Sequence, residues 1–152
     1  MTDSETSVNE GACRCGSTRF TVTGLPLITT ACHCRGCQTM TAGPFSLSSL
    51  YPAEAFAPTQ GTPVLGGIKG GTKHHFCPDC LSWLYTVPEG MDDFVNIRSA
   101  MLSDFDGHAP YAEFYLDEGL TGMKSGAVKS FGMAPDYDGF MQLMEEFAKL
   151  PN

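Results

Sequence analysis

Seven cysteines in three short clusters constrain this chain more than any other feature of its sequence. The clusters are C-x-C at residues 13–15, C-x-C-x-x-C at residues 32–37 and C-x-x-C at residues 77–80. A secreted disulfide framework would favour an even number of cysteines behind a signal peptide, whereas this chain starts with the polar, acidic segment MTDSETSVNE. In a reducing compartment, clustered thiols are more often metal ligands or catalytic groups. We therefore expect a cytoplasmic metal-binding protein.

The seven thiols divide most simply into a set of four and a set of three. Sulfurs around a tetrahedral zinc ion lie roughly 3.8 Å apart. Alternate residues of an extended strand lie about 6.6 Å apart, so the C-x-C pair must curl to chelate, whereas a C-x-x-C turn containing Pro78 brings two sulfurs together directly. Each pair then supplies two of the four ligands of a tetrahedral zinc ion. We expect a closed, structural zinc site with the ligands Cys13, Cys15, Cys77 and Cys80.

The middle cluster packs three thiols into six residues and leaves no fourth cysteine. Three protein ligands with one open position are typical of a reactive zinc ion. We expect Cys32, Cys34 and Cys37 to hold this second zinc, with water, an exogenous thiol, an imidazole or a carboxylate as the fourth ligand. His33 is a poor candidate for that position because it stands between two ligands, and either a role in orienting a ligand or no role at the site is the better interpretation. Thiolate sites also suit Cu(I) and iron–sulfur clusters, but a C-x-C pair does not match the common iron–sulfur spacings, which favours zinc.

The remaining sequence predicts a mostly β protein that ends in a helix. Its 152 residues, 42% of them hydrophobic, are enough to bury a core in one domain. Apolar side chains at helical spacing over residues 140–147 predict an amphipathic C-terminal helix that starts at Asp136 or Asp138 and packs on the core. Short runs rich in Thr, Val, Phe, Tyr and Ile predict strands at residues 19–23, 27–31, 45–51, 73–76, 83–87 and 94–99.

The charge pattern of the chain argues against two classes of partner. Nine Lys and Arg residues stand against 17 Asp and Glu, for a formal net charge of −8. No basic run or stripe is present, so we expect no nucleic-acid partner. No segment reaches the ~20 apolar residues of a membrane helix, so we expect no membrane partner. An anionic substrate would need local positive charge, and Arg35, inside the middle cysteine cluster, is the candidate at the second zinc.

The order of the three cysteine motifs along the chain is typical of a known family. The chain reads G-x-C-x-C-G from Gly11 to Gly16, then C-H-C-x-x-C from Cys32 to Cys37, then F-C-x-x-C from Phe76 to Cys80. In this order it resembles the glutathione-dependent formaldehyde-activating enzymes and the related centromere protein V (CENP-V/GFA) domains. The resemblance implies a β-tent fold of mixed antiparallel sheets around the zinc sites, and the same division of the cysteines. One departure is Leu81, since the family usually has Gly after the last cysteine.

The resemblance also implies an activity and a division of the chain. The named reaction of the family joins glutathione to formaldehyde and is classed with the carbon–sulfur lyases. We expect a disordered tail over residues 1–10, the zinc-binding domain over 11–120, and a C-terminal extension over 121–152 whose helix packs on the same domain.

Three hypotheses for function follow. The first is a zinc-dependent, carbon–sulfur lyase-like enzyme that forms or cleaves a thiol–aldehyde adduct, with glutathione as possible co-substrate and a small aldehyde as partner. In it, the ligands of the second zinc act together with His33 and Arg35. The second hypothesis is a zinc-stabilised binding module without catalysis. The third is a thiol redox or metal sensor, whose middle cluster loses zinc on oxidation.

Overall fold

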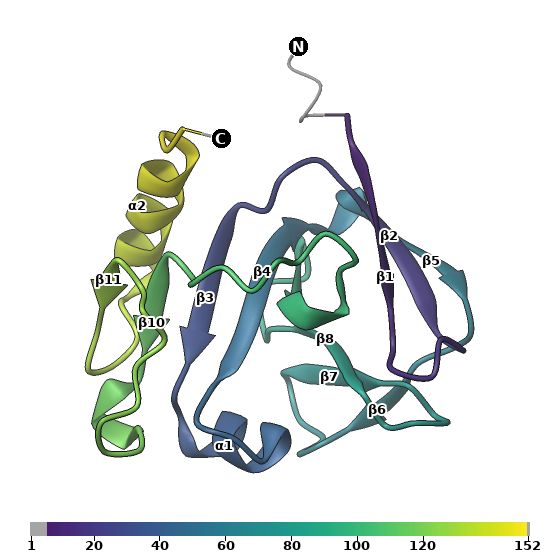
Figure 1. Cartoon of the computed structure of the whole chain (residues 1–152), viewed down its shortest axis with the longest axis horizontal. Coiled ribbons are helices and arrows are strands. Elements are labelled where there is room, and N and C mark those ends of the chain that lie inside the picture. Colours follow the sequence, from purple (N-terminus) through teal and green to yellow (C-terminus); the bar gives the residue numbers. More distant parts are fainter. Residues whose placement is uncertain (1–5, 152) are drawn as a thin grey trace. The chain divides into compact units, whose positions relative to one another are not determined.

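The computed structural model describes residues 6–151 (Figure 1). These residues divide into two compact units. Unit 1 comprises the described residues up to Pro26 together with Leu50–Gly107. Unit 2 comprises Leu27–Ser49 together with the described residues from His108 onward. Each unit is therefore built from two stretches of chain that are distant in sequence.

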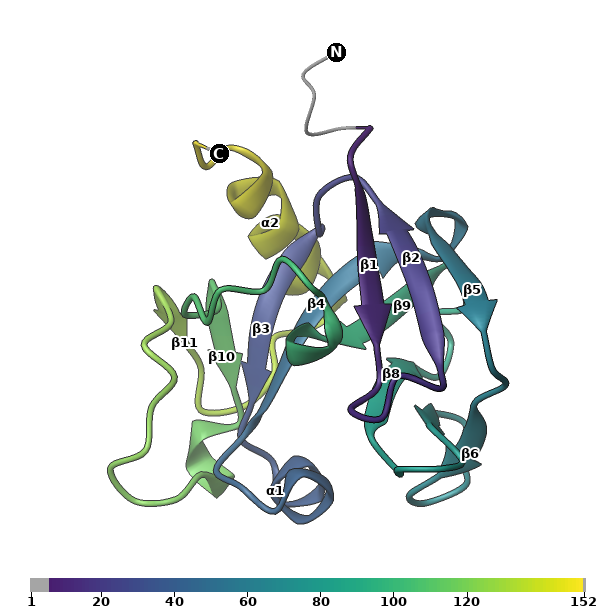
Figure 2. The ribbon, with the colours of Figure 1, turned by 45° about the vertical axis from the view of Figure 1, so that its right-hand side comes forward.

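One part of unit 1 is a three-stranded antiparallel sheet in the order β1-β2-β5 (Figure 2). Its strands are β1 (Val8–Ala12), β2 (Arg19–Thr23) and β5 (Phe56–Gln60). In β2, Phe20 and Val22 are buried while the residues between and beside them are more exposed, the alternation of a strand with one face on the core. Gly11 lies opposite Phe20 in the β1–β2 register, and a Cβ atom there would overlap the Phe20 ring. The glycine thus allows a close approach of the two strands at the edge of the core.

The other strands of unit 1 pair antiparallel in the order β9-β8-β7-β6. They are β6 (Val64–Gly66), β7 (Lys73–Phe76), β8 (Trp83–Val87) and β9 (Phe94–Arg98), and the short helices are η1 (Ala53–Ala55) and η2 (Ser99–Met101). Leu84 in β8 and Ile97 in β9 are fully buried. They share one hydrophobic core with Phe20, and Cys13 and Cys77 belong to the same core.

Unit 2 contains parallel strand pairs and the two α-helices. Its elements are β3 (Ile28–Cys32), α1 (Arg35–Thr41), β10 (Ala112–Phe114), η3 (Leu116–Glu118), β11 (Lys129–Ser130) and α2 (Tyr137–Ala148), and β4 (Ser46–Pro52) starts in it. Strand β10 pairs in parallel with both β3 and β11, so the three lie side by side (Figure 1). The parallel pairs make the sheet pattern of the protein mixed.

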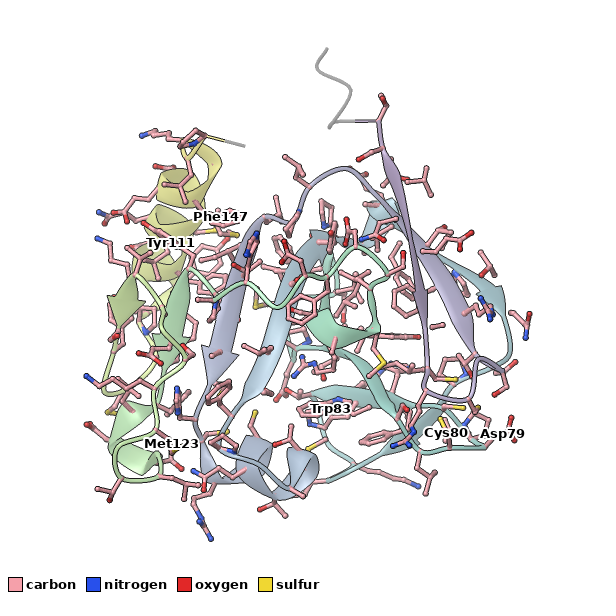
Figure 3. All side chains as sticks on the ribbon, in the orientation of Figure 1. Asp79, Cys80, Trp83, Tyr111, Met123 and Phe147 are labelled. Carbon is pink, nitrogen blue, oxygen red and sulfur yellow. The ribbon has the colours of Figure 1, made fainter. Side chains whose placement is uncertain are left out.

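Helix α2 packs on this group of strands. Asp136 caps its start, because the carboxylate accepts a hydrogen bond of 2.8 Å from the amide of Gly139. Leu143 and Met144 are its buried residues. The Phe147 ring lies 5.6 Å from the ring of Tyr111, just before β10 (Figure 3). The mostly β class with a C-terminal helix is thereby confirmed.

The six expected strands are all present, and their boundaries differ from expectation by no more than one residue. The sequence did not predict helix α1 or the strands β1, β5, β6, β10 and β11. Strand β1 begins at Val8, inside the segment expected to be a disordered tail, so that expectation is wrong for residues 8–10. Pairing with β2 along the whole of β1 explains the order there; residues 1–5 lie outside the described part of the chain. None of the helices within residues 6–151 has the length and hydropathy needed to cross a bilayer.

Candidate metal centres

The first candidate centre, called the four-cysteine site, consists of Cys13, Cys15, Cys77 and Cys80. The first two lie in the turn between β1 and β2, and the other two in the turn between β7 and β8 (Figure 3 labels Cys80). All four sulfurs lie within 4.8 Å of one another. The Cys15 sulfur is 3.5 Å from that of Cys13 and 3.9 Å from that of Cys77. These separations fit a tetrahedral four-thiolate zinc ion, whose sulfurs lie about 3.8 Å apart.

Backbone turns bring these sulfurs together. In the first turn, the amide of Gly16 donates to the carbonyl of Cys13 at 3.0 Å, and Gly16 takes a φ of +79°. This is the curl that a C-x-C pair needs in order to chelate. In the second turn, the amide of Leu81 donates to the carbonyl of Cys77 at 3.0 Å. Leu81 has a φ of +59°, in the left-handed region that favours glycine.

Two serine hydroxyls also contact the sulfurs of the four-cysteine site. Ser17 Oγ lies 3.1 Å from the sulfur of Cys15 and 3.3 Å from that of Cys77, and Ser82 Oγ lies 3.1 Å from that of Cys80. Sequence reasoning missed both serines. A signal was present, because each stands two residues after a cysteine, in C-G-S and C-L-S.

Hydrogen bonds at this site favour the thiolates of Cys77 and Cys80. Those from the Cys80 amide and then from the Ser17 hydroxyl lower the pKa of Cys77 to about 5. The Ser82 hydroxyl, followed by its amide, lowers the pKa of Cys80 to about 7. Because the thiolate is the form of cysteine that binds metal, these contacts prepare the site for a cation.

The second candidate centre, called the three-cysteine site, consists of Cys32, Cys34 and Cys37. Cys32 ends β3, Cys34 is the N-cap of α1, and Cys37 lies in the first turn of that helix. Their sulfurs lie within 4.8 Å of one another. The Cys34 sulfur accepts a hydrogen bond of 3.3 Å from the Cys37 amide, and the Ser46 hydroxyl donates to the Cys37 sulfur at 3.2 Å. The strand-to-helix junction thus gathers three thiols from six residues.

The electrostatics of this cluster fit a bound cation. A hydrogen bond shared with the neighbouring Cys37 thiol, and then burial, raise the pKa of Cys32. Burial also leads the causes that raise the pKa of Cys34. Three thiols held this close resist ionising together, and a divalent cation among them removes the repulsion. No fourth His, Cys, Asp or Glu within residues 6–151 joins the group.

His33 stands between two of the cysteines but is not part of the three-cysteine site. Its side chain is fully buried and its Nε2 lies 2.9 Å from Oε2 of Glu113. The ring also lies against that of Phe45, with centroids 4.9 Å apart. The His33 side chain therefore presents no surface to the solvent.

Arg35 is exposed at the start of α1. Its guanidinium donates to Oε1 of Gln38 at 3.1 Å, and its amide donates to Oε1 of Glu118 at 3.2 Å. The side chain borders an open hollow of about 340 Å³, which is also lined by Gln38, Thr39, Ala42, Gly43, Pro44 and Leu120. Arg35 therefore offers positive charge on the helix that carries Cys37.

Sequence reasoning missed two polar residues that surround the three-cysteine site. Buried Gln38 donates from Nε2 to the carbonyls of His33 at 2.7 Å and Glu118 at 2.9 Å. Glu113, in β10, is 1% exposed. Gln38 contacts Glu118, and Glu113 contacts His33, across 80 positions of sequence, and no local motif predicts either contact.

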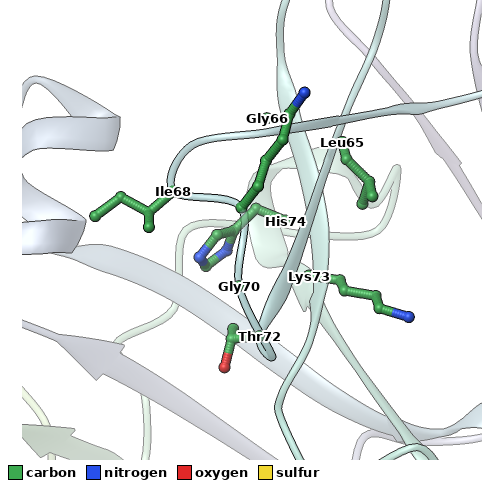
Figure 4. Close-up of a pocket in the computed structure, with 8 residues that line it drawn as sticks. Leu65, Gly66, Ile68, Gly70, Thr72, Lys73 and His74 are labelled. Atoms are coloured by element: carbon green, nitrogen blue, oxygen red, sulfur yellow. The ribbon is translucent and has the colours of Figure 1, made fainter.

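A second hollow, of about 240 Å³, lies at the turn between β6 and β7 (Figure 4). Its lining includes Ile68, Lys69, Thr72, Lys73 and His74. The His74 ring is turned toward β8, where its Nδ1 lies 2.9 Å from Oγ1 of Thr86. None of these residues belongs to either cysteine site.

The chain is similar to a known protein family and to a solved structure. The sequence model of the family described as "Glutathione-dependent formaldehyde-activating enzyme" (GFA) matches residues 8–118, a span that includes all seven cysteines. A crystal structure of a Rhodobacter sphaeroides protein from a structural genomics programme matches with a TM-score of 0.51 and 17% sequence identity, over 80% of this chain and 98% of that one. At this identity the similarity concerns the fold alone. A search of curated proteins found no match. With the family match over most of its length and both cysteine clusters assembled, the chain belongs to the GFA (CENP-V/GFA) domain family.

Proposed function

We propose that this protein is a zinc-dependent, carbon–sulfur lyase-like enzyme, which joins a small thiol to a small aldehyde and cleaves the adduct in reverse. Glutathione and formaldehyde are the substrates that the family name suggests. The observation that carries the proposal is the contrast between the two sites. Four sulfurs gather at one and three at the other, and the described residues add no further ligand atom to the second. Three protein ligands are the arrangement of zinc sites that accept a substrate.

The roles of the residues follow from their positions. Cys13, Cys15, Cys77 and Cys80 would hold a structural zinc on the core of unit 1. Cys32, Cys34 and Cys37 would hold the reactive zinc. The β-tent arrangement and the boundary at residue 120 are proposed on the same family basis.

The reaction forms one carbon–sulfur bond. The thiol sulfur attacks the carbonyl carbon, and the thiol proton ends on the aldehyde oxygen, so that RSH and an aldehyde give a hydroxyalkyl thioether. A thiol with a pKa near 8.5 is only ~3% thiolate at pH 7, and bound zinc would supply the positive charge that lowers this pKa. The fraction of thiolate then rises about 30-fold, which corresponds to roughly 2 kcal/mol.

Thiol activation alone is therefore a modest effect, and lower basicity also makes a thiolate less nucleophilic. Holding the two reactants together can contribute about 7–11 kcal/mol. The exposed guanidinium of Arg35 is the group placed to attract the carboxylates of an anionic thiol. His33 contributes by fixing the backbone between Cys32 and Cys34.

Exchange NMR on the thiol–formaldehyde equilibrium tests the proposal. Wild-type protein should accelerate adduct formation and breakdown beyond the spontaneous rate, which must be subtracted. Cys34→Ser should abolish the acceleration. Thr41→Ser, an exposed change on the same helix that keeps the hydroxyl bonded to the Cys37 carbonyl, is the matched control and should retain it. If wild type and Cys34→Ser both leave the spontaneous rate unchanged, the enzyme proposal fails and the binding-module hypothesis replaces it.

A comparison of a charged with an uncharged thiol distinguishes the role of Arg35 from that of the metal ligands. Arg35→Gln should raise the KM for glutathione about tenfold and leave kcat nearly unchanged, because the lost contact is to a remote carboxylate. With uncharged 2-mercaptoethanol the same variant should match wild type. An equal loss with both thiols would contradict this role.

A further inference from the structure

A buried carboxylate lies at the centre of unit 2. Glu113 is 1% exposed in the middle of β10 and accepts four hydrogen bonds. Its Oε2 accepts from His33 Nε2 at 2.9 Å, from the Ser125 amide at 2.9 Å and from the Ser125 hydroxyl at 2.7 Å, and its Oε1 accepts from the Ser130 hydroxyl at 2.7 Å. Burying a carboxylate is costly unless its oxygens are satisfied in this way. Such a set of donors indicates a specific role, since a hydrophobic residue would fill the same volume more simply.

The network leads directly to the backbone of the three-cysteine site. His33 is the residue between Cys32 and Cys34, and it is held at three points. Its amide donates to the carbonyl of Phe114 at 2.9 Å, its carbonyl accepts from Gln38 Nε2 at 2.7 Å, and its ring meets Glu113. Within the described part of the chain, His33 Nδ1 has no hydrogen-bond partner, so Glu113 alone fixes the orientation of the ring by hydrogen bonding.

Three of the four hydrogen bonds to the Glu113 carboxylate come from two residues in the C-terminal part of the chain. Ser125 and Ser130 lie beyond residue 118, where the match to the family ends. Ser130 belongs to β11, which pairs with β10, and the Phe131 amide donates to the carbonyl of Glu113 at 3.0 Å. The C-terminal extension is therefore tied to the residue that orients His33.

We propose that Glu113 is a positioning residue for the three-cysteine site, which through His33 sets the spacing of Cys32 and Cys34 and so the affinity and geometry of the metal held there. Ser125 and Ser130 fix the carboxylate from the side of the C-terminal extension. The inference rests on the metal site of the proposed function. A purely structural role for Glu113 would lower the stability of the fold without changing the metal site.

Cobalt(II) reconstitution distinguishes the two roles, because thiolate-bound cobalt has visible absorption bands that report ligand number and geometry. Glu113→Gln keeps the shape of the side chain but removes its charge and turns an NH₂ group toward existing donors. We expect the second cobalt equivalent to bind about tenfold more weakly, the low end of the range for groups that orient metal ligands. Its absorption bands should shift, while the first equivalent, at the four-cysteine site, keeps the wild-type affinity and spectrum.

Glu146→Gln is the matched control. The Glu146 carboxylate also joins elements of unit 2, accepting a hydrogen bond of 3.0 Å from Tyr111 and pairing with Lys129 at 3.4 Å, but it does not touch His33. This variant should leave both cobalt sites unchanged. Should Glu113→Gln fail to fold, Ser125→Ala decides, since it removes one hydroxyl from the oxygen that His33 also contacts. Because the loss of one hydrogen bond is a small change, this variant should weaken binding of the second cobalt equivalent about threefold.

The experiment distinguishes a failure of the positioning role of Glu113 from a failure of the second metal site. Unchanged second-site affinity and spectrum in folded Glu113→Gln, or in Ser125→Ala where that variant decides, would overturn the positioning role. Binding of only one cobalt equivalent by wild type would instead overturn the second metal site itself. The positioning role is supported if the affinity and absorption bands change only for the second cobalt equivalent in Glu113→Gln and do not change in Glu146→Gln.

Discussion

Cys77 and Cys37 are both proposed zinc ligands, but their surroundings differ. Cys77 is fully buried in the core of unit 1, and its site joins the β1–β2 turn to the β7–β8 turn. Cys37 is half-buried in a site whose ligands lie within one strand-to-helix junction. The same substitution should therefore have unequal consequences at the two positions.

We expect Cys77→Ser to unfold or aggregate the protein and Cys37→Ser to leave it folded. A four-thiolate zinc can contribute ~10–16 kcal/mol, by analogy with zinc-finger peptides, whereas a domain has only about 5–15 kcal/mol of net stability. The site at Cys37 links no distant segments. Circular dichroism melts of the zinc-loaded proteins check this, with Cys13→Ser expected to behave like Cys77→Ser. Equal damage at Cys77 and Cys37 would contradict the assignment of a structural and a reactive zinc.

The stability contributed by Glu113 should depend on pH. Burial alone would raise its pKa, but hydrogen bonds from Ser125, Ser130 and His33 outweigh burial and lower the pKa to about 2. Because the folded pKa lies below the ordinary value of 4.5, ionised Glu113 stabilises the fold above about pH 4.5 and loses this contribution as the pH falls toward 2.

Comparing wild type with Glu113→Gln, both loaded with metal at the four-cysteine site alone, isolates this effect, because acid then releases the same metal from both proteins. At pH 7 the variant should be less stable by about 3 kcal/mol, the usual cost of removing one member of a buried pair. The difference in free energy of unfolding should narrow steadily below pH 4.5. A difference that stays constant down to pH 3 would show that Glu113 is not the titrating group.

At the scale of elements, the turn between β7 and β8 carries two of the proposed metal ligands and a strained backbone position. Leu81, directly after the last cysteine, has a φ of +59° and is 67% exposed. The family pattern usually has glycine here, which the backbone conformation explains: a Cβ atom in the left-handed region costs roughly 1–2 kcal/mol. The exposed leucine side chain contributes little packing to offset that cost.

Leu81→Gly should stabilise the protein by about 0.5–1 kcal/mol, because relief of strain exceeds the added entropy of glycine in the unfolded chain. Leu81→Ala is the matched control, since it removes the side chain but keeps the Cβ atom, and it should give no gain. Thermal unfolding of both zinc-loaded variants checks this. A gain from alanine equal to that from glycine would place the effect in the side chain and not in the backbone.

Helix α1 is the element that forms the three-cysteine site, and sequence patterns did not reveal it. Its seven residues, RGCQTMT, lack the apolar periodicity on which helix prediction depends. Its N-cap is a cysteine, whose sulfur accepts from the Cys37 amide in place of the usual serine or aspartate oxygen. The C-cap of the helix is Ala42, which has the left-handed conformation in which glycine is more common.

For the whole molecule, each of the two compact units carries one of the cysteine sites. We expect two zinc ions per chain after purification without chelators, released in two steps as chelator is added. The three-cysteine site should empty first, because three thiolates and an exchangeable ligand hold its metal less tightly than four thiolates. Metal analysis along a graded chelator titration measures this. Release of a single metal in one step would contradict the two-site interpretation.

The sequence by itself determined the grouping of the cysteines, the family and the mostly β class. Ligand spacing and strand patterns are local properties, so C-x-C, C-x-C-x-x-C and C-x-x-C could be interpreted from the chemistry of thiols alone. The terminal helix followed from its apolar period and from two candidate caps, Asp136 and Asp138, of which the structure selects Asp136. Only the tertiary structure decided what surrounds the three-cysteine site. Glu113 meets His33 across 80 positions of sequence, and Gln38 meets Glu118 across the same separation. Such contacts depend on the parallel pairing of β3 with β10, which no short motif encodes.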